Sequence, residues 1–420
     1  MTAMAHVGVD DDLAISFRDV FEATKLISGK VLRTPTLPAP KLSQLTGAKV
    51  FVKYENLQVT GSFKDRGALV KLLSLTEEER RRGVIAMSAG NHAQAVAFRA
   101  RKLGIPALIV MPEHTPFVKV GNTEAFGAEV ILAGETVAEA REHALVIGEQ
   151  RGLVFVHPYD DPHVIAGQGT VGAELLEDQP DLDCAVFPIG GGGLIAGSAV
   201  AMKKMNPDVE IFGVESALFA SAKAALSGET AVCGGQTLAE GIAVKSVGGL
   251  TLPVIERLVS HIVAADENQI ERAVAAFMSL QKTMAEGAGA AGLAALIAEP
   301  ERFVGRKVGL VLTGGNIDVR MLASIMVRSL EREGKIISLR LIVNDQPGML
   351  GRVATCLGSS GANILEVSHR RMFLDVPAKG TTLDVTIEVK DASHAARVIG
   401  KLEGAGFSVV RLDGLAANGD

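Results

Sequence analysis

A lysine at the predicted start of a helix is the first residue whose position suggests chemistry. Lys64 lies in the segment 55–68, where Ser62 and Asp65 have the spacing of a capping box with the shorter acid. The helix dipole disfavours a positive charge at this end, so it favours the neutral amine, the form that attacks a carbonyl group. A solvated lysine in the first helical turn is the alternative interpretation.

A second cluster of polar residues follows a predicted buried strand at 84–87. It consists of five consecutive residues at the turn into the next helix: Ser88, Ala89, Gly90, Asn91 and His92. Ligands bind at such turns in open α/β sheets. Free backbone N–H groups, together with hydroxyl and amide side chains, suit a carboxylate or a ring oxygen. Plain helix capping by Ser88 or Asn91 is the alternative.

A run of four glycines connects a predicted strand at 184–189 to the next helix: Gly190, Gly191, Gly192 and Gly193. Without side chains, the backbone can approach a phosphate closely, with the helix dipole behind it. No Lys-Ser/Thr pair follows, which excludes a nucleoside-triphosphate loop. Gly191, Gly193 and Ala196 do fit a dinucleotide fingerprint, with Glu215 at the end of the next strand, so an NAD site remains a competing interpretation.

Thr313 ends another predicted strand, at 307–313, and its hydroxyl could reach the same crevice. Taken alone, it is equally well a small turn residue. Together, however, these turns offer a nucleophilic lysine, a phosphate cradle, a polar loop and a hydroxyl. This combination suits pyridoxal phosphate, which needs a partner for its aldehyde, a phosphate site and a contact for its ring nitrogen.

The elements that must position these residues alternate between strands and helices from about residue 50 to residue 330. The predicted strands are unbroken apolar runs, at 84–87, 107–111, 129–133, 153–157, 184–189, 210–215, 261–265 and 307–313. Such runs are typical of parallel strands that are buried on both faces, so the fold class is α/β. Residues 336–413 follow the different order βαββαβ with alternating strands, which predicts a ferredoxin-like module.

The composition narrows the classes of function. The chain has 420 residues, a net charge of −6 and no tryptophan, which disfavours nucleic-acid binding and polybasic membrane attachment. The charge-free stretch 184–202 contains a proline and the glycine run, so a buried strand and helix are expected there instead of a membrane span. No signal peptide is recognisable, and the cysteines are few and scattered. We therefore expect a cytoplasmic protein with reduced thiols.

Four motifs make the sequence similar to a known family. They are E-N-L-Q-x-T-G-S-F-K-x-R-G-A (55–68), S-A-G-N-H-A-Q (88–94), H-P-Y-D-D-P-x-x-I-x-G-Q-G-T (157–170) and G-G-G-G-L (190–194). Through these motifs, residues 15–330 resemble the pyridoxal-phosphate threonine dehydratases, or threonine ammonia-lyases. The resemblance implies the tryptophan-synthase-β-like fold, with two open parallel sheets and a smaller subdomain at about 50–155.

The tail resembles a single ACT domain at 336–413, after a linker at 331–335. The resemblance rests on N-D-Q-P-G-M-L (344–350) and G-A-N-I (361–364). Such domains usually bind amino-acid effectors, and here isoleucine or valine is expected at Asn344, Gly348 and Asn363. The family also implies a homodimer or a homotetramer. A purely structural dimerisation module is the alternative for this tail.

The resemblance assigns roles to the residues of the catalytic part by position. Lys64 would be the Schiff-base lysine, Phe63 would pack near the cofactor, and Asn91 would contact the ring oxygen of the cofactor. Thr313, where the family often has serine, would face the ring nitrogen. The phosphate would be held by Gly190, Gly191, Gly192, Gly193 and Leu194. The substrate carboxylate would be held by Ser88, Ala89, Gly90, Asn91 and His92.

Two acidic residues need separate interpretation. Glu286 would either line the site beside the cofactor or simply stand at a helix end. Glu215 matches the position of a divalent-metal ligand in some relatives. The acidic residues expected shortly after it are missing, so we expect no metal.

The activity implied by the resemblance is deamination of threonine to 2-oxobutanoate, with serine as a second substrate. Ala89 stands where related serine racemases have a serine, and an alanine cannot transfer a proton, so elimination is favoured over racemisation. The alternatives are a serine- or hydroxyaspartate-specific dehydratase or racemase of the same fold, an NAD-linked oxidoreductase, and a catalytically silent amino-acid sensor.

Overall fold

The computed structural model describes residues 13–344, 346–370 and 380–412. The chain divides into two compact units, Met1–Ile317 and Asp318–Asp420. The first unit contains a six-stranded and a four-stranded sheet, and the second contains a four-stranded sheet. The predicted end of the tail module at residue 413 lies outside the described residues.

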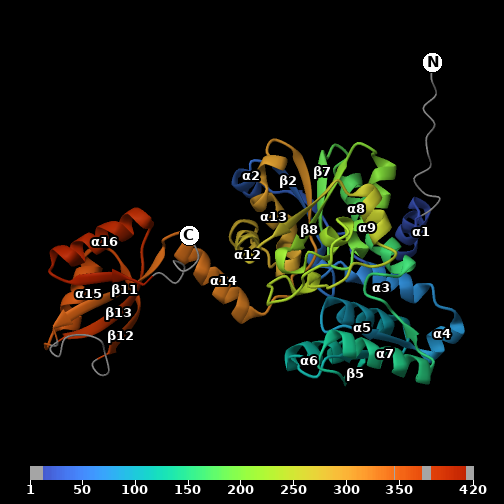
Figure 1. Ribbon diagram of the computed structural model, residues 1–420, viewed down its shortest axis with the longest axis horizontal. Coiled ribbons are helices and arrows are strands. Elements are labelled where there is room, and N and C mark those ends of the chain that lie inside the picture. The colour runs from blue at the N-terminus through green and yellow to red at the C-terminus, as the bar shows by residue number, and fades with distance from the viewer. Residues whose placement is uncertain (1–12, 345, 371–379, 413–420) are drawn as a thin grey trace, which may run out of the picture. The chain divides into compact units, whose positions relative to one another are not determined.

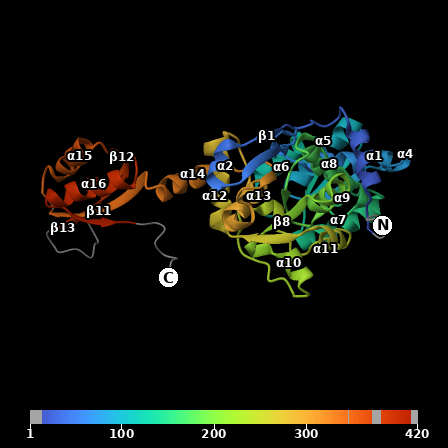
Figure 2. The ribbon, with the colours of Figure 1, turned by 90° about the horizontal axis from the view of Figure 1, so that it is seen from above.

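Six strands form the larger sheet of the first unit, in the order β1-β2-β10-β7-β8-β9. Only β1 is antiparallel to its neighbour. The strands are β1 (Thr36–Pro38), β2 (Lys49–Tyr54), β7 (Cys184–Pro188), β8 (Glu210–Ser216), β9 (His261–Ala265) and β10 (Lys307–Leu312). Helix α13 (Gly287–Ala298) lies on one side of this sheet, and α8 (Pro162–Asp178) and α9 (Gly193–Met205) lie on the other (Figure 1, Figure 2).

The charge-free stretch is buried protein interior, as predicted: strand β7, the glycine run and helix α9. Helices α8 and α9 pack with their backbones almost in contact, because glycines face each other. A Cβ atom on Gly197 would lie 2.2 Å from the carbonyl oxygen of Ile165. Among the described residues, no helix is both long and apolar enough to cross a membrane.

The smaller sheet of the first unit is wholly parallel, in the order β5-β4-β3-β6. Its strands are β3 (Val84–Met87), β4 (Ala107–Met111), β5 (Glu129–Leu132) and β6 (Val154–Phe155), and its covering helices are α5 (Asn91–Leu103), α6 (Phe117–Ala125) and α7 (Val137–Arg151). All the strands predicted for the first unit are present, with ends shifted by a residue or two. Strand β2, in contrast, was not predicted, and it pairs in the larger sheet.

The remaining helices of the first unit surround these two sheets. They are α1 (Phe17–Ile27), α2 (Pro40–Thr46), α3 (Lys64–Leu73), α4 (Glu77–Arg82), α10 (Ser221–Leu226), α11 (Leu252–Leu258) and α12 (Glu267–Gln281). Helix α3 follows β2 and packs against α8 and α5. Because α8 belongs to the larger sheet and α5 to the smaller one, α3 lies where the two sheets meet.

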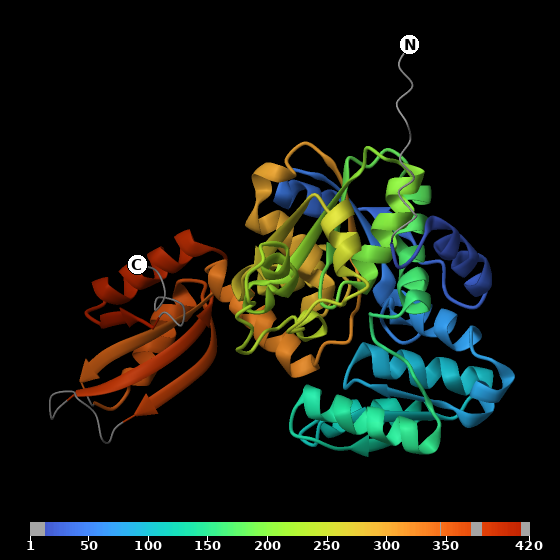
Figure 3. The same ribbon diagram turned by 45° about the vertical axis from the view of Figure 1, so that its right-hand side comes forward.

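The second unit begins with helix α14 (Val319–Arg332) and continues in the predicted order βαββαβ. Its elements are β11 (Ile336–Asn344), α15 (Met349–Ser359), β12 (Asn363–Arg370), β13 (Gly380–Glu388), α16 (Ala392–Gly404) and β14 (Ser408–Arg411). The sheet is antiparallel in the order β12-β13-β11-β14, drawn orange to red in Figure 3. Alternate residues of β11, from Ile337 to Val343, are buried, which confirms the predicted one-sided pattern.

Candidate active site

Three adjacent parallel strands bring the main predicted residues to one edge of the larger sheet. Strand β2 leads through a short 3₁₀ turn to Lys64, β10 leads to Thr313, and β7 leads to Gly190. The backbone N–H of Phe63 donates to the carbonyl oxygen of Thr313 at 3.0 Å. Parallel neighbours end at the same edge, so the sheet itself assembles this group.

Lys64 is the first residue of α3, as predicted, and the residue as a whole is half-buried. Its Nζ donates to the backbone carbonyl oxygen of Pro158 at 2.8 Å and lies 5.1 Å from the centre of the Phe63 ring. Burial lowers the pKa of Lys64 to about 8, although the nearby Glu286 carboxylate opposes the shift. A large share of this amine is therefore neutral at mildly alkaline pH, which suits a nucleophile.

The capping box predicted for this helix is wrong. The residue that precedes α3 is Phe63, which makes no side-chain cap. The Asp65 carboxylate instead accepts hydrogen bonds from Thr60 Oγ1 at 3.0 Å and from Arg99 Nη2 at 3.1 Å. Ser62 Oγ is buried and has no hydrogen-bond partner among the described residues. The Asp65 carboxylate, which the spacing predicted to cap the helix, is thus bound by Arg99, an arginine distant in the sequence.

A buried ionic network holds α3 in place two residues after Lys64. The Arg66 guanidinium is fully buried between two carboxylates, with Nη2 2.8 Å from Glu55 Oε1 and Nη1 2.7 Å from Glu174 Oε1. Lys53 Nζ, also fully buried, lies 2.7 Å from Glu174 Oε2. Since these groups belong to α3, the end of β2 and α8, the network joins the helix that carries Lys64 to the larger sheet.

The glycine run forms a tight turn at the start of α9. Gly192 has a φ of +90°, and Thr251 Oγ1 donates to the carbonyl oxygen of Gly191 at 2.7 Å. A Cβ atom on Gly191 would lie 2.1 Å from the Tyr159 ring, so a side chain at this position is excluded unless the ring moves. Within the described residues, no acceptor outside α9 receives a hydrogen bond from the backbone N–H groups of 190–194. These N–H groups, which we call the glycine cradle, are therefore free to donate to a bound anion.

These observations fit pyridoxal phosphate. The cradle supplies donors for the phosphate, Lys64 supplies an amine with a lowered pKa, and Thr313 supplies a buried, neutral hydroxyl. Among the described residues, Thr313 Oγ1 makes only a long contact, 3.5 Å, to the carbonyl oxygen of Ala288. Together with Ser62 Oγ, it leaves hydroxyl groups at this edge available to a ligand.

Asn91 belongs to the same site, although it follows a strand of the smaller sheet. Its Nδ2 donates to Glu286 Oε1 at 2.6 Å, and its Oδ1 accepts a hydrogen bond from Asn316 Nδ2 at 2.7 Å. Burial raises the pKa of Glu286 to about 7. Glu286 precedes α13 but makes no side-chain cap. Of its two interpretations, the structure therefore favours the one that places it in the site.

The loop Ser88–His92, predicted to bind the substrate carboxylate, has free space beside its middle residue, Gly90. Ser88 Oγ accepts a hydrogen bond from the backbone N–H of Gly90 at 3.1 Å. A Cβ atom on Gly90 would meet no atom within 4 Å. The loop therefore has room for a ligand beside it, and the Ser88 hydroxyl hydrogen remains available as a donor.

The side chain of His92 does not suit a carboxylate. Its ring is buried, with Nε2 2.9 Å from the carbonyl oxygen of Val156. Because a carbonyl only accepts, Nε2 carries the hydrogen, and Nδ1 is left as an acceptor without a partner among the described residues. Burial lowers the pKa of His92 to about 3, so the ring stays neutral. Only the backbone N–H of His92 could bind a carboxylate.

Glu215 is also explained by local hydrogen bonds. Its carboxylate accepts from the backbone N–H groups of Ala222 at 2.7 Å and Lys223 at 3.0 Å. Within the part of the chain that the structure describes, no group of three or more metal-binding side chains is found. The carboxylate therefore holds the start of α10.

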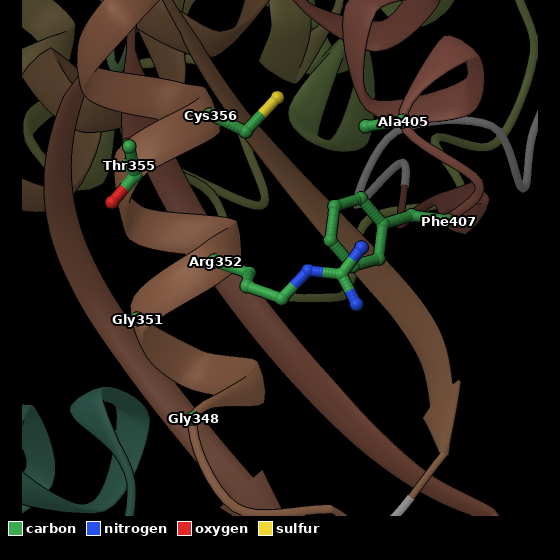
Figure 4. A pocket seen from close by; sticks show the side chains of 7 residues that line it. All are labelled: Gly348, Gly351, Arg352, Thr355, Cys356, Ala405 and Phe407. Carbon is green, nitrogen blue, oxygen red and sulfur yellow. The ribbon is translucent and has the colours of Figure 1, made fainter.

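The second unit has an open surface pocket of about 520 Å³ where α15 begins and α16 ends (Figure 4). The Arg352 guanidinium lies over the Phe407 ring, 5.6 Å from its centre, as Figure 4 shows. The pocket is lined by Gly348, Gly351, Arg352, Thr355, Cys356, Ala405 and Phe407. Of the three residues predicted for the effector, only Gly348 is among them.

The strand register explains why Asn363 lies apart from the other two. Asn363 begins β12 and pairs with Glu388 of β13, which pairs in turn with Ile336, the first residue of β11. Asn344 is the last residue of β11. The two asparagines therefore lie at opposite ends of the sheet, and within one copy of the chain they do not form one site. This corrects the predicted grouping.

Sequence reasoning missed three residues that shape the site. Asn316 and Tyr159 each follow a predicted strand, at 307–313 and 153–157, and the rule that strand ends meet would have indicated both. Thr251, in contrast, reaches the glycine run from the turn before α11. No local signal in the sequence indicates that contact.

Comparison with known proteins agrees with this geometry. Residues 27–314 match the family described as pyridoxal-phosphate dependent enzyme, and residues 335–405 match the ACT domain. The L-threonine ammonia-lyase of Thermotoga maritima is 44% identical over 397 residues, which are 94% of this chain and 99% of that protein.

Solved structures resemble about three quarters of this chain. A threonine deaminase isoform from Solanum lycopersicum is 34% identical with a TM-score of 0.69, covering 74% of this chain and 86% of its own. A serine racemase from Dictyostelium discoideum is also 34% identical with a TM-score of 0.69, covering 73% of this chain and 100% of its own. The chain therefore belongs to the family of pyridoxal-phosphate-dependent enzymes, with an ACT domain joined to the C-terminal side of its first unit.

Proposed function

We propose that the chain is an L-threonine ammonia-lyase, which converts L-threonine to 2-oxobutanoate and ammonia and also accepts L-serine, giving pyruvate. The observation that carries the proposal is the position of Lys64. Its partly neutral amine stands at the edge where the glycine cradle, Thr313 and Asn91 meet. The relative from Thermotoga maritima, named for this activity, matches this chain along nearly its whole length.

The residues of the site can be assigned to the parts of the cofactor. The backbone N–H groups of 190–194 would hold the phosphate, Asn91 the ring oxygen and Thr313 the ring nitrogen. Lys64 would hold the aldehyde carbon through its amine. Bound in this way, pyridoxal phosphate supplies an electron sink for the charge that develops at Cα of the substrate.

The residues of the chain perform the remaining work. The Ser88–Gly90 loop binds the substrate carboxylate and orients the Cα–H bond toward Lys64. Lys64 Nζ, as the free amine, removes the Cα proton, and the carbonyl oxygen of Pro158 then stabilises the resulting ammonium. The β-hydroxyl takes up a proton, for which the Lys64 ammonium is the donor that this chain supplies, and leaves as water, and a water molecule then hydrolyses the released enamine to the oxo acid and ammonia. Thr313 offers a neutral hydroxyl instead of a carboxylate, which weakens the sink and favours expulsion of a β-substituent over transamination.

Ala89 supports elimination over racemisation. A racemase needs a second acid or base on the opposite face of the substrate, and the methyl group of Ala89 cannot transfer a proton. We therefore expect oxo-acid production to exceed D-amino-acid production by a wide margin. Rates of D-serine and pyruvate formation from L-serine would test this directly, and comparable rates would contradict it.

The test of the function is the visible absorbance spectrum of the purified protein before and after addition of L-threonine. A bound cofactor gives a visible band that changes on addition, and 2-oxobutanoate accumulates. An NAD-linked enzyme would show no such band, and a silent sensor would form no oxo acid. Absence of the band in protein supplied with pyridoxal phosphate would contradict the proposal.

We also propose that the ACT domain binds isoleucine or valine in the pocket of Figure 4. Arg352 supplies a positive charge for the carboxylate, and the Phe407 ring supplies apolar surface for the side chain. Regulation requires a coupling free energy between this site and the catalytic one. Kinetics with and without isoleucine, combined with calorimetry, would measure that coupling.

A homodimer or homotetramer is proposed as the assembly, in the cytoplasm. Leu365 and Val367 on the edge strand β12 are 49% and 39% exposed, and apolar side chains beside a free sheet edge support association of copies. The three cysteines are all free, which supports a reducing compartment. Light scattering coupled to gel filtration would establish the number of copies.

A further inference from the structure

Three side chains from separate turns form a chain of hydrogen bonds near Lys64. Asn316, in the turn after β10, donates from Nδ2 to the backbone carbonyl oxygen of Thr60 at 2.8 Å and to Asn91 Oδ1 at 2.7 Å. Asn91 Nδ2 then donates to Glu286 Oε1 at 2.6 Å. The chain therefore runs from a backbone carbonyl, through two amides, to a carboxylate.

The direction of this chain is set at its first member. A backbone carbonyl only accepts hydrogen bonds, so Asn316 must turn Nδ2 toward Thr60. With its two amide hydrogens used by Thr60 and Asn91, Asn316 requires the oxygen of Asn91 to face it. If the Asn91 amide were reversed, its N–H groups would face those of Asn316 on one side, and its oxygen would face Glu286 Oε1 on the other.

Two glycines allow the chain to pack this closely. A Cβ atom on Gly61, which has a φ of +72°, would lie 2.5 Å from Asn316 Oδ1. A Cβ atom on Gly314 would lie 2.2 Å from Glu286 Oε1 and 3.1 Å from Asn91 Nδ2. The backbone N–H of Gly315 also donates to the carbonyl oxygen of Gly61 at 3.0 Å, which holds the two turns together. The amides thus have little freedom to rotate.

We propose that Asn316 is a positioning residue, which sets the direction of the Asn91 amide so that the second hydrogen on Nδ2 is offered to the ring oxygen of the cofactor. The inference rests on the proposed function, from which it takes the contact between Asn91 and that oxygen. Asn316 itself needs to touch neither cofactor nor substrate. A reversed Asn91 would present an oxygen lone pair to the ring oxygen, and the contact would become repulsive.

The substitution Asn316→Asp tests the direction of the amide. An ionised carboxylate cannot donate to Asn91, so Asn91 reverses to donate to it and turns Oδ1 toward Glu286. We expect pyridoxal phosphate to bind about tenfold more weakly, the loss expected for one such hydrogen bond. The visible band of the bound cofactor should also shift. Titration of the cofactor-free protein with pyridoxal phosphate measures both effects.

A double substitution separates positioning from stability. In Asn316→Asp combined with Glu286→Gln, the glutamine amide can donate to the reversed Asn91, so both hydrogen bonds of the Asn91 amide are restored in the opposite direction, and only the carbonyl oxygen of Thr60 stays without its donor. The temperature of thermal unfolding of the cofactor-free protein should then recover toward that of Glu286→Gln alone, while affinity and spectrum should not recover. If Asn316 were merely structural, stability and cofactor binding would recover together, and the proposal would be overturned.

Asn56 provides a matched control in the same neighbourhood. Its Nδ2 donates to Thr283 Oγ1 at 2.9 Å and to the carbonyl oxygen of Met284 at 3.1 Å, and it lies beside Gly315 without contacting Asn91. Asn56→Ala should bind pyridoxal phosphate as the unaltered protein does. Equal affinity in Asn316→Asp and Asn56→Ala would refute the inference about Asn316. A failure of the unaltered protein to bind the cofactor would refute the proposed function instead.

Discussion

Lys64 Nζ and the backbone carbonyl oxygen of Pro158 lie 2.8 Å apart. This hydrogen bond joins helix α3, which follows β2 of the larger sheet, to the loop that follows β6 of the smaller sheet.

Lys64→Ala should abolish the visible absorbance of the bound cofactor and lower threonine deamination by orders of magnitude, because no amine remains to attach the cofactor or to remove the proton. Lys71, in the same helix, pairs with Asp161. Lys71→Ala should keep the band, and a band that persisted in Lys64→Ala would contradict the assignment.

The pKa of Glu286 predicts a pH dependence of stability. Burial raises this pKa from 4.5 to about 7. Between these values the folded protein holds a proton that the unfolded chain has released, so the stabilisation is present at the acid end and is lost as the pH rises toward 7. Glu286→Gln cannot titrate. The difference in free energy of unfolding between the two proteins should therefore change by up to about 3 kcal/mol across this window.

Urea unfolding of the cofactor-free protein, repeated between pH 4.5 and about 7, would measure this difference. A constant difference across the range would show that Glu286 keeps an ordinary carboxyl pKa. Lys64, Lys119, Glu240 and Asn91 are the groups whose charges or hydrogen bonds act on Glu286. Asn91→Ala removes the hydrogen bond that lowers this pKa, so it should raise the pKa of Glu286 further and widen the pH range over which stability changes.

Arg66 predicts a large loss of stability when it is truncated. Arg66→Ala leaves the Glu55 carboxylate buried without its direct partner and leaves Glu174 paired with Lys53 alone, and breaking such a buried pair lowers the free energy of unfolding by about 3–5 kcal/mol. Arg33 pairs with Glu177 and Asp178 but is 52% exposed. Arg33→Ala should lower it by less than about 1 kcal/mol. Similar losses in the two variants, measured by urea unfolding, would argue against the network as a support for α3.

Because Gly191 packs against Tyr159, we expect a single added methyl group at this position to weaken cofactor binding. In Gly191→Ala the new Cβ atom would lie 2.1 Å from the Tyr159 ring, so the ring or the turn must move, and affinity for pyridoxal phosphate should fall. Gly121, in helix α6, has no atom within 4 Å of a Cβ position. Gly121→Ala should leave affinity unchanged and raise stability by about 0.5–1 kcal/mol. Spectroscopic titration of both variants tests the comparison.

Arg352 predicts where the effector binds. Arg352→Ala should weaken isoleucine or valine binding about tenfold or more, because the effector carboxylate loses its cationic partner. Arg397, which bonds to Ser393 on helix α16, is a control in the same unit. Arg397→Ala should bind as the unaltered protein does. Calorimetry on the full chain measures both affinities, and equal weakening in the two variants would place the effector elsewhere.

Much of the site could be predicted because it lies at the ends of buried strands. Unbroken apolar runs mark these strands, and the polar residue after each run is delivered to a common edge whatever the order of the strands. Thr313 and the glycine run were found in this way, whereas Lys64 was found from its position at the start of a predicted helix. Asn316 and Tyr159 obey the same rule, and only their roles were missed.

The remaining features depend on partners that are distant in the sequence. Strand β2 was not predicted because Lys53 interrupts its apolar run, and the charge is tolerated only because Glu174, in α8, pairs with it. The capping box failed because Arg99, in α5, takes the Asp65 carboxylate. Asn363 was grouped with Asn344 because local motifs carry no information about strand register. In each case, tertiary contacts override a local pattern.

The two sheets carry different parts of the site, and this arrangement favours evolutionary change in substrate range. The glycine cradle, Thr313 and Lys64 follow strands of the larger sheet, whereas the Ser88–Gly90 loop follows β3 of the smaller sheet. Mutations around β3 that spare Asn91, the one cofactor contact assigned there, could therefore change which amino acid is accepted while the remaining contacts to the vitamin-derived group are inherited intact. Diversification of substrate range among descendants of such a scaffold should accordingly concentrate in the smaller sheet and its loops.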